Sequence, residues 1–121
     1  MKHCLVVDDS RVIRKVACTI MEGFDFETGE AEDGSAALSA CRQRMPELIL
    51  LDWNIPNSNV YEFLRALRRE QNGSHPVVVF CTTENNVNRI SDAMMAGAND
   101  YVLKPYDRKT IAEKLGQIGL A

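Results

Sequence analysis

The feature that most constrains the fold is a strict alternation of short apolar runs with amphipathic segments. Runs suited to β-strands lie at residues 4–7, 26–31, 47–51, 77–81 and 101–103. After each run, apolar residues recur at spacings of three and four, which is the pattern of one helix face. The runs at 4–7, 47–51 and 77–81 are almost wholly apolar, as expected of strands that are covered on both faces. We therefore expect an α/β fold, a doubly wound sandwich with a five-stranded parallel sheet between two layers of helices.

Length and charge exclude several classes of protein. The 121 residues are enough for one domain with one core, and the net charge of −3 lacks the basic surplus of a nucleic-acid binder. The apolar runs are too short to span a membrane, and the start, MKHCLVVDDS, does not resemble a secretory signal. We expect a cytoplasmic protein made of one domain over 1–121, with no output domain.

The four cysteines do not have the spacing of a metal site. No pair forms a CxxC motif, no histidine lies near one at ligand spacing, and each falls in an apolar run or on an apolar helix face. Cys4, Cys18, Cys41 and Cys81 are therefore expected to be buried thiols in a reducing compartment.

Polar side chains that could bind a metal ion or take part in a reaction follow four of the predicted strands. In parallel α/β folds the functional crevice lies at the carboxyl ends of the strands, so these residues should meet in one small region. They are Asp8, Asp9 and Ser10 after the first strand, Asp52 after the third, Thr82, Thr83 and Glu84 after the fourth, and Lys104 and Pro105 after the fifth.

Three carboxylates in one region are costly unless a cation neutralises them. Mg²⁺ prefers oxygen ligands, so Asp9 and Asp52 are candidate direct ligands, with Asp8 bound directly or through water and a further oxygen from the Asn54 backbone carbonyl. A lysine and a hydroxyl, Lys104 and Thr82, are suited to phosphoryl oxygens. Asp52 would then be the nucleophile that forms an aspartyl phosphate. Taken singly, each of these residues could instead be an ordinary cap, turn or solvated loop residue.

Four motifs together resemble the receiver domain of bacterial two-component response regulators. They are VVDDS at 6–10, DWNIPN at 52–57, FCTTE at 80–84 and YVLKP at 101–105. The resemblance covers the whole chain, and the separations of 30 residues from Asp52 to Thr82 and 22 from Thr82 to Lys104 also fit. Within the family, the chain looks most like the single-domain, CheY-like chemotaxis regulators.

The resemblance implies a flavodoxin-like sheet of order 2-1-3-4-5 and a role for each motif residue. Asp52 would accept a phosphoryl group from a histidine kinase, with Mg²⁺ on Asp8, Asp9, Asp52 and the Asn54 carbonyl. Thr82 and Lys104 would contact the phosphoryl oxygens, Tyr101 would be the switch aromatic, and the Lys104–Pro105 bond would be cis. Asn54 and Glu84 would flank the phosphoryl group.

The implied output is a change in the surface of the fourth helix, fifth strand and fifth helix. A partner such as the flagellar motor switch would bind that surface. The protein would be a monomer, and it would not be an enzyme beyond its own phosphorylation and dephosphorylation.

The sequence departs from the family pattern at one place. The family usually has Asp-Gly seven and eight residues after the phosphoacceptor, whereas this chain has Asn59 and Val60. A β-branched residue is strained at the positive φ that glycine permits. Either Val60 starts the third helix early, or the loop at 57–60 differs in shape.

Other functions remain open from the residues alone. They are a phosphate sink or phosphorelay receiver, an adaptor that works without phosphorylation, a phosphatase of the haloacid-dehalogenase type, and a flavodoxin-like carrier of FMN. The phosphatase reading lacks an Asp-x-Asp motif after the first strand, and the two aspartates there would repel the phosphate of FMN. We interpret Arg65, Arg68 and Arg69 as a solvated helix face, and His3 and His75 as ordinary polar residues.

Overall fold

The computed structural model describes residues 1–57, 59–83 and 87–121. The strands are β1 (His3–Val7), β2 (Glu27–Ala31), β3 (Leu48–Asp52), β4 (Val77–Thr82) and β5 (Asp100–Leu103). The helices are α1 (Arg11–Glu22), α2 (Gly34–Gln43), α3 (Val60–Arg69), α4 (Val87–Ala96) and α5 (Arg108–Ile118). Strand and helix alternate along the chain, as the apolar pattern predicts.

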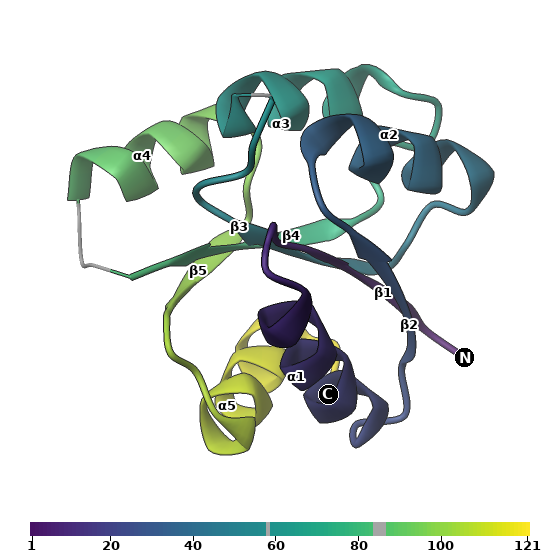
Figure 1. Cartoon of the computed structure of the whole chain (residues 1–121), viewed down its shortest axis with the longest axis vertical. Helices are drawn as coiled ribbons and strands as arrows, with labels where there is room; N and C mark the ends of the chain where they lie inside the picture. The colour runs from purple at the N-terminus through teal and green to yellow at the C-terminus, as the bar shows by residue number, and fades with distance from the viewer. Residues whose placement is uncertain (58, 84–86) are drawn as a thin grey trace.

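All five strands are parallel, and their order across the sheet is β2-β1-β3-β4-β5. Helices α2, α3 and α4 cover one face of the sheet, and α1 and α5 cover the other (Figure 1). The expected doubly wound sandwich and its strand order are therefore confirmed. No helix within the described ranges is long and apolar enough to cross a membrane.

Each strand divides its side chains between two cores, because successive residues point to opposite faces. On β3, Ile49 and Leu51 belong to the core under α2, α3 and α4, while Leu48 and Leu50 belong to the core under α1 and α5. The same alternation on β1 places Val7 in the first core. Asp8 and Asp52 are the next residues of these two strands, so both side chains turn toward the face that carries α1 and α5.

The cysteines follow the same division and are all buried free thiols, as expected. Cys4, Cys18 and Cys81 lie in the core under α1 and α5, and Cys41 lies in the other core. Burial raises the pKa of Cys41 to about 11 and that of Cys81 to about 12. These thiols are therefore protonated at neutral pH and contribute as small apolar side chains.

Candidate functional site

The aspartates after β1 and β3 meet because their strands are neighbours in register. Val7 pairs with Leu51, so Asp8 and Asp52 occupy matching positions at the carboxyl edge of the sheet. Both are almost completely buried, at 4% and 5% exposure, and Asp9 beside them is exposed. Oxygen atoms of the three carboxylates lie within 4.8 Å of one another. The predicted acidic cluster is therefore present.

Lys104 connects the two buried carboxylates. Its Nζ donates to Asp52 Oδ1 at 2.8 Å and to Asp8 Oδ2 at 3.0 Å. Lys104 follows β5, two strands away from β3, and its long side chain reaches across the end of β4. Pro105 comes next, and the Lys104–Pro105 peptide bond is cis, as the resemblance implied.

The charges of this cluster influence one another. Burial raises the pKa of Asp52, and the hydrogen bond from Lys104 opposes that rise while the neighbouring Asp8 adds to it. Burial also pulls the pKa of Lys104 down, but its hydrogen bonds to Asp52 and Asp8 outweigh burial, so that pKa is raised. Three carboxylates and one ammonium leave two formal negative charges at the cluster. A hard divalent cation suits this donor set, because all of the ligands are oxygens.

Local hydrogen bonds hold both aspartates in place. Asp8 Oδ1 accepts from the amide of Ser10 at 2.9 Å, and Ser10 in turn caps α1 by accepting from Ile13. Asp52 Oδ2 accepts from the amide of Asn54 at 3.4 Å. Asp8 is therefore both a turn residue and a member of the acidic cluster.

Thr82 and Tyr101 lie on the opposite face from the two aspartates. Thr82 is the last residue of β4 and is completely buried. Tyr101 pairs with Phe80, whose side chain lies in the core under α2, α3 and α4, so the two predicted switch residues share one face of neighbouring strands. Tyr101 is 36% exposed, with the Lys114 ammonium 5.7 Å from its ring centre.

The start of α3 resolves the departure at Asn59 and Val60. Asn59 caps the helix with extended backbone, and its Oδ1 accepts from the amides of Tyr61 and Glu62. Val60 is the first helical residue and is buried. Among the described residues of this loop, Asn57 has a positive φ of 59°. The first of the two alternatives is therefore correct, because α3 starts at Val60. Ser58, in the same loop, and Glu84, after β4, lie outside the residues that the structure describes.

Sequence reasoning missed two arginines. Arg68 is not part of a solvated face, since it donates to the carbonyls of Gly73, Pro76 and Gly97 and to Asn99 Oδ1, and this corrects the interpretation given above. The guanidinium of Arg89 on α4 stacks on Trp53, at 3.8 Å from the ring centre. Arg68 and Gly97 are 29 positions apart, and Arg89 and Trp53 are also distant in the sequence, so no local pattern indicates these contacts.

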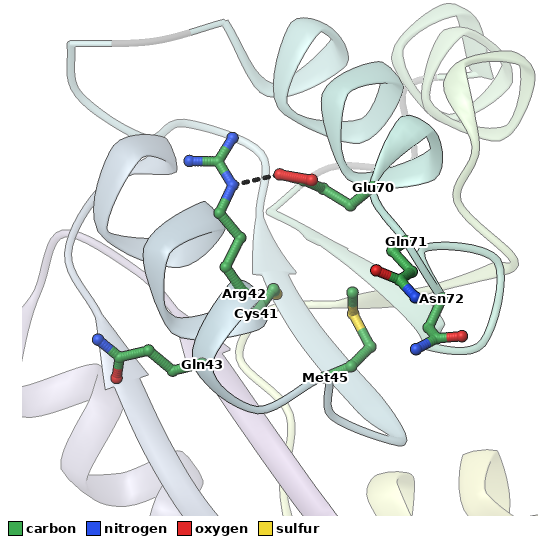
Figure 2. Close-up of a pocket in the computed structure, with 7 residues that line it drawn as sticks. All are labelled: Cys41, Arg42, Gln43, Met45, Glu70, Gln71 and Asn72. Carbon is green, nitrogen blue, oxygen red and sulfur yellow. Dashed lines mark hydrogen bonds and ion pairs between the residues drawn. The ribbon is translucent and has the colours of Figure 1, made fainter.

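A separate cleft, of about 380 Å³, lies away from this cluster. It is formed where α2 and α3 end, beside the amino ends of the strands, and Figure 2 shows Arg42 and Glu70 joined by an ion pair across it. Its lining includes Cys41 but none of the residues that the sequence predicted for the phosphoryl or metal site.

Comparisons with known proteins agree with this geometry. The model of the response regulator receiver domain matches residues 4–116. This chain belongs to that family. Receiver domains are modules of two-component signalling, and this receiver domain is 32% identical over 115 residues to the chemotaxis protein CheY of Pseudomonas aeruginosa, covering 94% of this chain and 93% of that protein.

Two further relatives differ in how much of their own length this chain covers. The phosphate regulon regulatory protein PhoB of Escherichia coli is also 32% identical, across 94% of this chain but only 50% of PhoB. Among solved structures, the chemotaxis response regulator CheY4 of Vibrio cholerae superposes with a TM-score of 0.91 at 26% identity, covering 98% of both chains. The receiver fold is thus shared with proteins of different overall length.

Proposed function

We propose that this receiver domain is a phosphorylation-controlled switch in which Asp52 accepts a phosphoryl group from the phosphohistidine of a sensor histidine kinase. The single observation that carries the proposal is Lys104, held between the buried carboxylates of Asp8 and Asp52. A buried carboxylate beside a lysine and further acidic ligands is the arrangement that phosphoryl transfer to aspartate requires.

In the proposed reaction, an Asp52 oxygen forms a bond to phosphorus while the bond from phosphorus to the histidine nitrogen breaks. Lys104 moves its hydrogen bond from the Asp52 carboxylate to a phosphoryl oxygen, and the Thr82 hydroxyl donates to another. Asp8, Asp9, Asp52 and the Asn54 carbonyl would hold Mg²⁺. When bound, Mg²⁺ neutralises the carboxylates and the charge that develops on the phosphoryl oxygens. A receiver domain of a sensor histidine kinase from Pseudomonas aeruginosa, 23% identical, is described with a magnesium ion in its active-site cleft.

The proposed output follows from the shared face of Thr82 and Tyr101. When Thr82 shifts toward the phosphoryl group, space opens on the side that Tyr101 occupies on the neighbouring strand. The Tyr101 ring then turns inward, and the surface of α4, β5 and α5 changes shape. A protein that prefers this shape, such as the flagellar motor switch, would bind the phosphorylated state. We propose no turnover of an external substrate beyond self-catalysed phosphorylation and dephosphorylation.

Intact-mass spectrometry tests the proposal. The purified protein is incubated with acetyl phosphate and Mg²⁺, and with EDTA in place of Mg²⁺. We expect a gain of one phosphoryl group that needs Mg²⁺ and disappears in Asp52→Asn. Asp92→Asn, an exposed aspartate on α4, is the matched control and should behave as wild type. An adduct that persists in Asp52→Asn at the same yield would refute Asp52 as the acceptor.

A further inference from the structure

Arg14 on α1 joins the loop after β1 to the edge of the sheet. Its Nη1 donates to the backbone carbonyl of Asp8 at 2.8 Å, and its Nε donates to Glu30 Oε1 on β2 at 2.9 Å. The Arg14 side chain is only 13% exposed, so it lies against the protein rather than in solvent. A planar guanidinium presents its donors in fixed directions. The position of the Asp8 carbonyl is therefore tied to β2.

The bond from Arg14 completes the hydrogen bonding of Asp8. The Asp8 amide donates to the Ala31 carbonyl at 3.1 Å, its Oδ1 accepts from the Ser10 amide at 2.9 Å, and its Oδ2 accepts from Lys104 at 3.0 Å. The amide, the carbonyl and both carboxylate oxygens of Asp8 therefore each have a partner. The peptide group that follows Asp8 is held at its oxygen by Arg14.

Asp9 depends on that peptide group for its placement. Asp9 is exposed, and its carboxylate accepts no hydrogen bond from any residue within the described ranges. One of its oxygens nonetheless lies within 4.8 Å of oxygens from Asp8 and Asp52. The chain leaves β1 at Asp8, so the orientation of the Asp8 carbonyl sets the direction from which Asp9 starts. Backbone placement, rather than a side-chain contact, therefore keeps the Asp9 carboxylate at the cluster.

We propose that Arg14 is a positioning residue of the metal site, which holds the peptide between Asp8 and Asp9 so that the Asp9 carboxylate is placed as a Mg²⁺ ligand. This inference rests on the Mg²⁺ site of the proposed function. Arg14 itself does not bind the metal. Groups that orient metal ligands in this way change metal affinity by roughly 10- to 100-fold when they are removed.

Charge and positioning predict opposite effects of removing Arg14. The guanidinium is a cation beside a cluster with an excess of negative charge, so its charge alone weakens Mg²⁺ binding by repulsion. On charge alone, its removal would tighten binding, whereas loss of a positioning residue weakens it. Lys15 supplies the matched control. It donates to the same Glu30 from the next residue of α1, at 2.7 Å, and its ammonium makes no hydrogen bond to Asp8.

The test measures Mg²⁺ affinity without a phosphodonor. Proteins labelled with ¹⁵N are titrated with MgCl₂ at constant ionic strength, and the dissociation constant is taken from the shifts of the backbone amides at 8–10 and 52–54. The variants are Arg14→Gln, Arg14→Lys and the control Lys15→Gln. Urea denaturation in EDTA confirms that each variant is folded.

We expect Arg14→Gln to weaken Mg²⁺ binding about tenfold. Arg14→Lys keeps the charge but lacks the planar fork, so it should recover part of the loss and weaken binding about threefold. Lys15→Gln should stay within about twofold of wild type. Phosphorylation by acetyl phosphate gives a second readout. In Arg14→Gln the Mg²⁺ concentration for half-maximal rate should rise, while the rate at saturating Mg²⁺ should change by less than about twofold.

Unchanged or tighter Mg²⁺ binding in Arg14→Gln, or equal weakening in Arg14→Gln and Lys15→Gln, would overturn the positioning role and leave the metal site standing. A slower rate at saturating Mg²⁺ with an unchanged half-saturating concentration would also overturn it, because Arg14 would then act on phosphoryl transfer. If Arg14→Gln does not fold, Arg14→Lys decides, and an affinity equal to that of wild type refutes the proposal. Wild-type amides that did not respond to Mg²⁺ would instead refute the metal site of the proposed function, and this inference with it.

Discussion

Lys104 donates hydrogen bonds to carboxylates carried by two different strands, at 2.8 Å to Asp52 and 3.0 Å to Asp8. One ammonium does not balance three carboxylates, so the cluster keeps two formal negative charges, and two of its three carboxylates are buried. Burial is also the main reason that the pKa of Asp52 is raised. The charge of buried Asp52 therefore lowers the stability of the folded protein. A bound cation that neutralises the carboxylates can restore this stability.

Replacement of the Asp52 charge should stabilise the metal-free protein. A raised pKa means that folded Asp52 binds its proton more readily than unfolded Asp52. Stability is therefore lost as pH rises from the unfolded pKa through the higher folded pKa. Asp52→Asn keeps an oxygen for Lys104 and removes this penalty. We expect it to raise the free energy of unfolding at pH 7.5 in EDTA by about 1 kcal/mol. Urea denaturation measures this, with Asp92→Asn as control, and an Asp52→Asn protein less stable than wild type would contradict it.

These residues were predictable because their placement follows from strand order alone. Asp8, Asp52 and Lys104 each come directly after an apolar run, and parallel strands bring their carboxyl ends to one edge. The cis bond before Pro105 came only from the family resemblance, since X-Pro bonds in folded proteins are mostly trans. Arg89 gave no local signal, because its partner Trp53 lies 36 positions earlier in the chain.

For helix α3, the sequence pattern predicted the buried face but not the contacts of its arginines. Its apolar stripe predicted the buried face correctly, with Phe63, Leu64 and Leu67 in the core. The pattern could not predict which arginine near the end of the helix would donate hydrogen bonds to backbone carbonyls of neighbouring loops. Arg68 does so and joins the end of α3 to the end of α4 and to the loop before β4. Similarly, Val12 and Val16 on α1 fit an apolar stripe but are 71% and 52% exposed, because α1 is buried through Ala17, Cys18 and Met21.

Arg68 should be a major contributor to stability. Its guanidinium donates to three backbone carbonyls and to Asn99 Oδ1, and one of those carbonyls belongs to Gly97, which has a positive φ of 132° after α4. Arg68→Gln leaves most of these acceptors unsatisfied. We expect the free energy of unfolding to fall by roughly 2–3 kcal/mol. Arg69→Gln, the exposed neighbour on the same helix, should change it by less than about 0.5 kcal/mol. Equal effects of the two substitutions in urea denaturation would show that the Arg68 contacts contribute little.

Ionisable groups lie at both ends of the parallel strands. The acidic cluster lies at the carboxyl edge, and His3 lies at the amino edge, at the start of β1. Burial lowers the pKa of His3, and Arg44 lowers it further, while Glu47 and Glu27 oppose them. Protonation of His3 is therefore unfavourable in the folded protein.

A pH dependence of stability follows from His3. Because its folded pKa is below the unfolded value of 6.5, stability is lost as pH falls through 6.5 toward the folded pKa. We expect the loss of unfolding free energy between pH 7.5 and 5.5 to be smaller in His3→Gln than in wild type. His75→Gln, at an exposed position, should show the wild-type loss. Parallel pH profiles for His3→Gln and wild type would exclude His3 as the cause.

Two-dimensional ¹H–¹⁵N NMR can show whether phosphorylation of Asp52 changes the surface of α4, β5 and α5, as we propose. Spectra are recorded with Mg²⁺ alone and after addition of beryllofluoride, which mimics the phosphoryl group on a carboxylate. We expect shift changes that extend from the site through Thr82 and Tyr101 into α4 and α5, and that are absent in Asp52→Asn. Changes confined to residues 8–10, 52–57 and 104–105 would mean that Asp52 binds the group without any change in the surface of α4, β5 and α5, and the proposed switch would be refuted.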